Sequence, residues 1–245
     1  MIGLQLYTVR KLTTDAKGCE DALRRIKEMG YDCVQLAGDI DTVERTAAAC
    51  VALRLPVVGI LGSMRLCHES KERWLAAARL CGASDIGISS SADSAEKAAD
   101  LIVEANAFAA EVIAEGFTFS YHNHSNEFIR TACGKTVMEL LLEGFDPRIR
   151  LMPDTYWLQH GGVDVRDFIE RHAARIGVLH FKDMKRTAEG PTFAELGVGN
   201  INFPGIVRLA QDLGIKDYIV EQDVCDGDPL VSAQISCTYL KNLLK

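Results

Sequence analysis

The chain has 245 residues and a formal net charge of −7, with 27 lysine and arginine residues against 34 aspartate and glutamate residues. Its composition, 48% hydrophobic and 25% charged, is typical of soluble globular domains, and the length allows a large core. The acidic balance disfavours nucleic acid and acidic membranes as main partners, because phosphate binding needs clustered lysine and arginine side chains, and the sequence holds no such cluster.

The first residues, MIGLQLYTVRK, lack a basic region followed by an apolar stretch, so they predict a first strand rather than a signal peptide. No apolar run approaches the ~18 residues that a membrane span needs. The eight cysteines are scattered without a CxxC pair, which is typical of buried free thiols in a reducing compartment. We therefore expect a cytoplasmic protein without a membrane segment.

In the first half of the chain, short apolar runs alternate with longer amphipathic ones. We expect strands over residues 3–9, 32–37, 56–62 and 85–90, and helices over residues 20–30, 41–53, 70–82 and 91–116. Three of these helices end at a glycine (Gly30, Gly82 and Gly116), the usual residue after a helix C-terminus.

The second half repeats the rhythm. We expect strands over residues 117–123, 149–157, 177–184 and 217–223, and helices over residues 134–144, 163–176, 203–214 and 229–245. Eight strand–helix units in about 250 residues predict an α/β fold, a closed (β/α)8 TIM barrel with parallel strands. A doubly wound open sheet is the rival, but the glycine-rich turn that usually follows its first strand is missing. Without a flexible linker, residues 1–245 form a single predicted domain.

Polar side chains gather where the predicted strands end, and in a barrel the C-terminal strand ends share one mouth. The first strand ends with Gln5 and Tyr7; the fifth with His122, Asn123 and His124, followed by Glu127; the sixth with Asp154, Tyr156 and Trp157; the seventh with His180, Lys182 and Asp183; and the eighth with Glu221 and Asp223. Four consecutive strands therefore end in side chains that can bind a metal.

Such side chains within buried strands are costly to bury unpaired, and a divalent cation would offset that cost. A mixed set of carboxylates and imidazoles suits manganese, zinc, cobalt or iron better than calcium. We therefore expect one divalent metal ion per chain, with manganese as the first choice and zinc, cobalt, iron or magnesium as alternatives.

Several stretches resemble one known family: IGLQLYTVR, YHNHSNEF, DTYW, HFKD, LGVGNINFPGIV and IVEQD. They are similar to the xylose-isomerase-like TIM barrels of the sugar phosphate isomerase/epimerase superfamily, which includes tagatose 3-epimerase and inosose dehydratase. The resemblance covers essentially the whole chain, but its motifs identify the superfamily better than the substrate. It implies a metal shell of Glu, Asp, His and Glu at the ends of strands five to eight. Asp154, His180 and Glu221 match the last three positions.

The first position of that shell departs from the family pattern, because His122 stands where relatives have a glutamate. Either His122 takes the place of that glutamate, or Glu127 folds back from the following loop. We favour Glu127 as the fourth ligand, since a second carboxylate brings the site close to neutrality and leaves a histidine free for proton transfer.

The resemblance implies removal of a proton α to a carbonyl through an enediolate, the chemistry of a sugar isomerase or epimerase. In related epimerases, two glutamates on opposite faces exchange the proton. Here Glu221 is the candidate for one face, and His122 or His124 for the other. This asymmetry also fits a metal-dependent lyase, a dehydratase or β-eliminase acting on a keto-sugar, keto-inositol or 3-keto-glycoside.

The remaining strand-end residues are candidates for substrate contacts. Lys182 either anchors the substrate during catalysis or pairs with Asp183 at the rim, and Trp157 and Tyr7 either stack on a sugar ring or pack under a loop. We also expect Gln5, Asn123 and Asp183 to bind substrate. The resemblance implies a small sugar or sugar derivative as ligand and a homo-oligomer, with a partner subunit as a further option. A DNA-repair nuclease and a non-catalytic binding protein are the rival classes.

Overall fold

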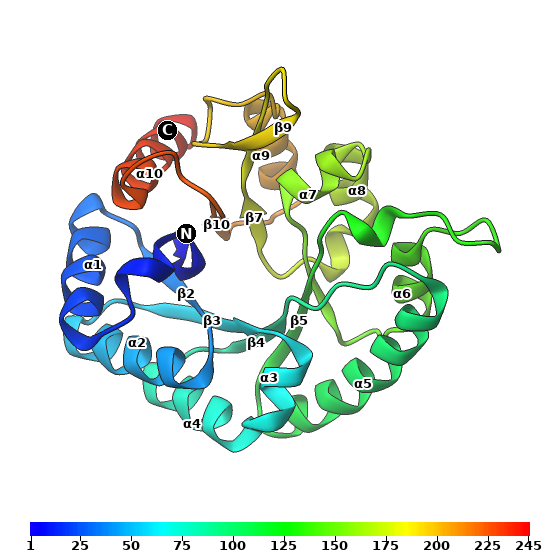
Figure 1. The fold of residues 1–245 in the computed structure, drawn as a ribbon, viewed down its shortest axis with the longest axis horizontal. Helices are drawn as coiled ribbons and strands as arrows, with labels where there is room; N and C mark the ends of the chain where they lie inside the picture. Colours follow the sequence, from blue (N-terminus) through cyan, green and yellow to red (C-terminus); the bar gives the residue numbers. More distant parts are fainter.

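Eight short parallel strands form the centre of the computed structural model, which describes residues 1–245 (Figure 1). The strands are β1 (Ile2–Gln5), β2 (Cys33–Ala37), β3 (Val57–Gly62), β4 (Asp85–Ile88), β5 (Thr118–His122), β6 (Arg150–Met152), β7 (Leu179–Phe181) and β10 (Tyr218–Val220). They lie in the order β6-β5-β4-β3-β2-β1-β10-β7. Each strand therefore neighbours the next one along the barrel, as alternating strands and helices predict.

The two ends of this sheet, β6 and β7, meet through isolated bridges rather than a full ladder. Leu151 pairs with Ile176, and Asp154 pairs with His180, both in the parallel sense. The backbone N–H of His180 donates to the carbonyl of Pro153 at 2.9 Å. The ring is thus nearly closed, which confirms the predicted (β/α)8 TIM barrel.

The helices form an outer ring around the strands (Figure 1). They are α1 (Ala16–Met29), α2 (Ile40–Leu53), α3 (Met64–Glu69), α4 (Lys71–Cys81), α5 (Ala95–Ala114), α6 (Val137–Gly144), α7 (Thr155–His160), α8 (Val165–His172), α9 (Phe203–Asp212) and α10 (Pro229–Leu243). Gly30 follows α1 with a φ of 83°, and its N–H donates to the carbonyl of Lys27. None of the helices combines the length and apolar character that a membrane crossing requires.

Two predicted strands end earlier than the sequence suggested. Residues Leu6–Leu12 form a 3-10 helix, η1, and Thr155–His160 form α7, although both ranges begin within runs that read as strands. The cause is a side chain at each boundary. The side-chain oxygen of Gln5 accepts from the N–H of Tyr7 at 3.2 Å, and Asp154 Oδ1 accepts from the N–H of Trp157 at 3.0 Å. These caps start a helical turn directly after the strand.

The sequence pattern did not predict the β-hairpin that follows β7. Its strands are β8 (Asp183–Arg186) and β9 (Pro191–Ala194), which pair in the antiparallel sense. The Asp183 carboxylate holds the loop that follows: it accepts from the backbone N–H groups of Met184, Gly197, Gly199 and Ile201 at 2.8–3.1 Å. The stretch LGVGN is therefore an anion-binding loop whose anion is a side chain of the same protein.

The backbone of this loop requires its glycines. Gly197 has a φ of 82°, in the left-handed region that favours glycine. A Cβ atom added to Gly199 would collide with the Asp183 carboxylate. These two positions let the N–H groups converge on Asp183, which fixes the chain next to Lys182.

Replacing Asp183 by asparagine should destabilise the fold, because an amide NH₂ group would face backbone N–H donors that now bind a carboxylate. We expect the free energy of unfolding to fall by about 2–4 kcal/mol. Urea denaturation of the variant measures this, with exposed Asp212→Asn as the matched control. Equal stability of the two variants would show that the loop does not depend on the carboxylate.

Candidate active site

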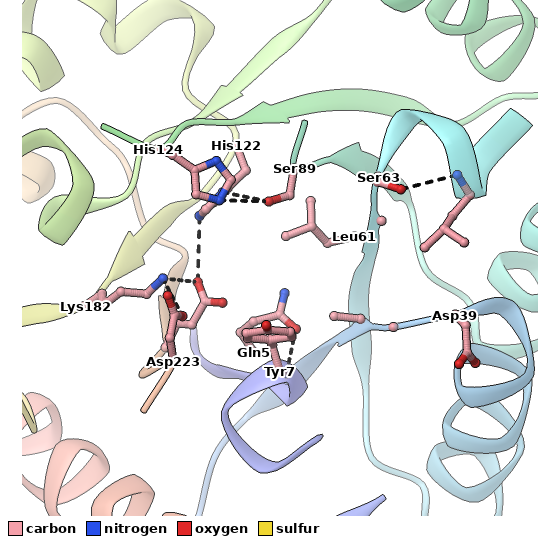
Figure 2. A pocket seen from close by; sticks show the side chains of 15 residues that line it. Gln5, Tyr7, Asp39, Leu61, Ser63, Ser89, His122, His124, Lys182 and Asp223 are labelled. Atoms are coloured by element: carbon pink, nitrogen blue, oxygen red, sulfur yellow. Dashed lines mark hydrogen bonds and ion pairs between the residues drawn. The ribbon is translucent and has the colours of Figure 1, made fainter. Parts of the chain in front are cut away.

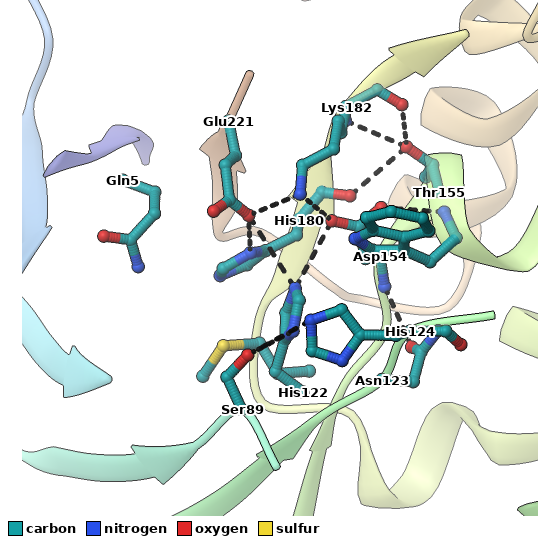
Figure 3. Close-up of polar contacts among 12 residues, drawn as sticks. Gln5, Ser89, His122, Asn123, His124, Asp154, Thr155, His180, Lys182 and Glu221 are labelled. Carbon is teal, nitrogen blue, oxygen red and sulfur yellow. Dashed lines mark hydrogen bonds and ion pairs between the residues drawn. The ribbon is translucent and has the colours of Figure 1, made fainter. Parts of the chain in front are cut away.

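Four side chains that can bind a metal converge at the C-terminal mouth of the barrel (Figure 3). They are His122 at the end of β5, Asp154 two residues after β6, His180 in β7 and Glu221 directly after β10. One ligand atom of each lies within 4.8 Å of the others, and all four residues are buried. The direction of the parallel strands brings these distant residues together, since each strand delivers its last side chains to the same mouth.

The hydrogen bonds of His180 are compatible with a cation at this place. His180 Nε2 lies 2.8 Å from Gln35 Oε1, and His180 Nδ1 lies 2.9 Å from Glu221 Oε2. Because Gln35 Oε1 can only accept, His180 Nε2 must carry the hydrogen of that bond. Nδ1 therefore faces the Glu221 carboxylate either with a second hydrogen, which it donates, or with a lone pair, which a cation between the two atoms could bind.

Burial keeps the His122 ring neutral. It lowers the pKa of His122 from 6.5 to about 4, although the neighbouring Asp154 opposes the shift. His122 Nε2 lies 3.3 Å from Asp154 Oδ2 and 3.7 Å from Glu221 Oε2. At neutral pH the imidazole therefore has a lone pair available for a ligand bond.

Both carboxylates of the group stay ionised. Burial by itself would raise the pKa of Asp154 and of Glu221, but the Lys182 ammonium and the neighbouring histidines together more than compensate. As a result the pKa of Asp154 lies below its usual value and that of Glu221 lies well below it, with His180 adding to the effect on Glu221. The site therefore offers two imidazoles and two charged carboxylates.

Lys182 is the internal counter-charge of the site. Its buried ammonium lies 3.0 Å from Asp154 Oδ2, 3.2 Å from Glu221 Oε2 and 2.8 Å from Asp223 Oδ1. Burial would lower the pKa of Lys182, but these three carboxylates raise it above its usual value. Three carboxylates and one ammonium leave two negative charges, which a divalent cation would neutralise. The residues present thus fit a divalent metal ion.

The structure places Glu127 outside this group of donors. Its Oε1 accepts from the Tyr121 hydroxyl at 2.7 Å, and its Oε2 accepts from the backbone N–H of His124 at 3.1 Å. The short 3-10 helix η2 (Asn126–Phe128) turns this side chain inward under the loop, where it is buried. The position of Glu127 does not favour it as the fourth ligand, because its oxygens already bind the loop. His122, the alternative, lies within the group.

His124 stands at the mouth, beside a residue that the sequence did not single out. Ser89 Oγ lies 3.3 Å from His122 Nδ1 and 3.4 Å from His124 Nε2, so the serine connects the two imidazoles. The His124 side chain is 28% exposed, whereas that of His122 is 3% exposed. His124 is thus the imidazole that a ligand can reach. Ser89 follows β4 directly. Its position at the end of a strand could have predicted it as a site residue.

A pocket of about 480 Å³ opens above these groups (Figure 2). The predicted site residues that line it are Gln5, Tyr7, His122, His124, Lys182, Glu221 and Asp223, and the lining residues not predicted include Gly38, Asp39, Ser63 and Ser89. The unpredicted ones follow β2, β3 and β4. They line the part of the barrel mouth next to β2, β3 and β4, where the sequence predicted no metal-binding residue.

The sequence model of the xylose isomerase-like TIM barrel matches residues 23–243. This chain belongs to that family. Among curated proteins, an inosose dehydratase of Lactiplantibacillus plantarum is 28% identical over 148 residues, which cover 53% of this chain and 48% of the relative. An inosose dehydratase of Geobacillus kaustophilus is 27% identical over 148 residues, 53% of this chain and 47% of the relative. The chain therefore matches about half the length of these relatives.

Solved structures of the same fold match the whole chain. A sugar phosphate isomerase/epimerase from Parabacteroides distasonis superposes with a TM-score of 0.80 at 22% identity, covering 100% of this chain and 95% of the other. A 3-keto-D-glucoside 4-epimerase from E. coli superposes with a TM-score of 0.73 at 16% identity, covering 98% of each chain. At these identities the likeness establishes the fold.

In this xylose isomerase-like barrel, three residues predicted to bind substrate hold the site in place. Asn123 Oδ1 accepts from the N–H of Asp154 at 3.1 Å, and its amide donates to the carbonyl of His124 at 3.2 Å. The Trp157 ring lies 5.5 Å from the His124 ring and 5.4 Å from the Lys182 ammonium. Asp183 binds the loop of residues 195–201, as described above. None of the three lines the pocket, and their contact with substrate stays a prediction.

The lowered pKa of His122 makes the stability of the metal-free protein dependent on pH. A folded-state pKa of about 4, below the usual 6.5, means that the unfolded chain binds this proton more tightly. Stability is therefore full above the usual value and falls as pH drops from about 6.5 toward 4, by about 3 kcal/mol in all. Asp154 and Glu221, whose pKa values are also lowered, add a loss in the same direction at lower pH.

Urea denaturation at successive pH values, with a chelator present, measures this dependence. His122→Gln should flatten the fall between pH 6.5 and 4, the two pKa values of His122, because glutamine does not titrate. His160→Gln, at an exposed position, should leave the fall unchanged. The interpretation fails if His122→Gln and the wild type show the same slope.

Proposed function

We propose that this protein is a metal-dependent enzyme that removes the proton α to a carbonyl of a sugar or sugar derivative, as sugar isomerases and epimerases do. One observation carries the proposal: His122, Asp154, His180 and Glu221 place two imidazoles and two carboxylates in one buried group at the edge of a pocket of sugar size. A pocket of about 480 Å³ is within the range of small-molecule sites.

These four residues would hold the metal, with manganese as the first choice and zinc, cobalt, iron or magnesium as alternatives. When bound, a divalent ion polarises a carbonyl and stabilises the negative charge that develops on its oxygen as the α proton leaves. The metal group and the pocket share His122 and Glu221. A ligand in the pocket would therefore meet the metal centre directly.

Glu221 is the proposed base. Its Oε2 is occupied by His180 Nδ1 and the Lys182 ammonium, whereas Oε1 makes no hydrogen bond or ion pair. Lys182 keeps the carboxylate ionised, so Glu221 is ready to accept a proton at neutral pH. The same ammonium is also held by Asp223, and a contact between Lys182 and the substrate stays a prediction.

His124 is the proposed second proton-transfer group. His122 lies between it and Glu221: the two imidazole rings are 5.2 Å apart, and His122 Nε2 is 3.7 Å from Glu221 Oε2 (Figure 3). A substrate that spans this distance would meet a carboxylate at one side and an imidazole at the other. Glu221 alone suffices to move a proton between adjacent carbons in an isomerase, and an epimerase would use both groups.

A lyase is the second candidate, favoured by the same asymmetry. An elimination needs a base for the α proton and a different group to protonate the leaving oxygen. Glu221 and His124 provide such an unlike pair, and the relatives matched over half of the chain are inosose dehydratases. The lyase substrate would be a keto-sugar, a keto-inositol or a 3-keto-glycoside. Cytoplasmic location and assembly with copies of itself or with a partner subunit stay predictions.

Elemental analysis of the purified protein tests the metal centre. We expect about one divalent metal ion per chain in the wild type. His122→Gln should lose most of it, because the pair of imidazole donors is broken. Glu127→Gln is the matched control and should retain the metal, since its side chain binds the loop instead. Metal lost from Glu127→Gln and kept in His122→Gln would reverse this assignment.

Proton exchange in D₂O tests the reaction. We expect the manganese-loaded protein to incorporate deuterium α to the carbonyl of at least one free keto-sugar or keto-inositol, followed by NMR. His124→Gln should lower turnover by about 10²–10⁴-fold while the metal stays bound, because proton transfer to or from the substrate loses its imidazole. His160→Gln serves as the control. A new stereoisomer or positional isomer identifies an isomerase or epimerase, and loss of water or an aglycone identifies a lyase. The proposal is wrong if no compound in the panel exchanges a proton.

A further inference from the structure

The charges that line the pocket are mostly negative. Asp39, Glu221 and Asp223 contribute carboxylates, and Lys182 contributes the one ammonium. That ammonium already contacts Asp154, Glu221 and Asp223 within 3.2 Å. Its charge is therefore compensated inside the protein, and a ligand meets a wall with no free positive side chain.

The helix ends that face the pocket are capped by their own chain. Asp39 Oδ1 accepts from the N–H of Thr42 at 2.8 Å at the start of α2, and Ser63 Oγ accepts from the N–H of Leu66 at 3.3 Å at the start of α3. Figure 2 shows Asp39 and Ser63 across the pocket from Lys182. Helix N-termini commonly bind phosphate through such N–H groups. Here a carboxylate occupies the end of α2 that a phosphate would need.

Arg10 contacts two residues of the pocket lining but does not itself line the pocket. Arg10 Nη1 donates to the carbonyls of Tyr7 at 2.8 Å and Asp223 at 2.9 Å. Its guanidinium lies 3.9 Å from the centre of the Tyr7 ring. Tyr7 lines the pocket and Arg10 does not, so the tyrosine ring has the guanidinium on its other side. Arg10 therefore stabilises the mouth rather than offering a charge to a ligand.

We infer that the substrate is an uncharged polyhydroxy ketone rather than a sugar phosphate, and that Asp39 is a specificity-determining residue that excludes phosphate esters. The carbonyl end of the substrate lies at Glu221 and His122, and its far end lies toward Asp39 and Ser63. A hydroxyl at that end donates to the Asp39 carboxylate, whereas a phosphate there meets a like charge. The inference rests on the proposed function and narrows its substrate class.

Matched pairs of probes test this inference: D-fructose with its 6-phosphate, and D-xylulose with its 5-phosphate. Deuterium incorporation α to the carbonyl is measured for each with the manganese-loaded wild type. We expect exchange with a free sugar and at least tenfold slower exchange with its ester. In Asp39→Asn the ratio between the two should shrink by about tenfold, because one like charge is removed. Asparagine caps a helix as well as aspartate does, so α2 keeps its start.

Two outcomes would overturn the inference while leaving the proposed function standing. The first is exchange of an ester as fast as, or faster than, exchange of its free sugar in the wild type. The second is a ratio that Asp39→Asn leaves unchanged. In either case, loss of ester exchange in Arg10→Gln would identify Arg10 as the phosphate anchor.

If no probe exchanges its α proton, the proposed function fails for this set of compounds. A separate measurement of phosphate binding then tests the inference. The probe is then inorganic phosphate at millimolar concentration. Its binding is measured as a change in the thermal unfolding midpoint of the metal-free protein. Chloride at equal ionic strength is the reference. An unchanged midpoint for the wild type supports exclusion of phosphate from the pocket. A rise of the wild-type midpoint overturns it.

Discussion

The buried carboxylates at the mouth of the barrel impose the constraint on which the site depends. Asp154 and Glu221 bring negative charge into a buried region, half-buried Asp223 adds a third carboxylate beside them, and Lys182 supplies only part of the balancing charge. Charges buried this deeply remain ionised only when they are paired. The excess explains why this group suits a divalent cation. The pKa values of Asp154 and Glu221 are lowered in spite of it, because Lys182 and the neighbouring histidines act against burial and against the other carboxylates. A protein without that cation carries uncompensated charge at its centre.

The barrel and the loops share the task of holding this group. A bridge between Asp154 and His180 closes the ring. Both residues belong to the donor group, so the contact that closes the barrel also brings two of the donors together. Around it, Asn123 and Glu127 fix the segment after β5 through side-chain contacts to backbone groups. These polar side chains near the site thus form hydrogen bonds with the backbone. Few side chains are left free to contact a ligand.

The pocket has two unlike ends, and this difference connects the proposed reaction to the proposed substrate. At the metal end, Glu221 and His124 provide a carboxylate and an imidazole, a pair suited to moving a proton beside a carbonyl. At the other end, Asp39 and Ser63 offer acceptors and no positive charge. A polyhydroxy ketone matches both ends, since its carbonyl meets the metal centre and its hydroxyls meet acceptors.

The sequence by itself determined the eight strand–helix units and placed Asp154, His180 and Glu221 at one mouth. It could do so because apolar periodicity fixes the elements, and parallel strands deliver their last residues to the same end. Only the tertiary structure put His122 within the donor group and Glu127 outside it, turned Asp183 toward its glycine loop and brought Asp39 and Ser89 to the pocket. The direction of a loop side chain depends on partners that are distant in sequence or on the path of the backbone, as for Gly197 and Gly199 around Asp183. Such contacts leave no periodic pattern in the chain.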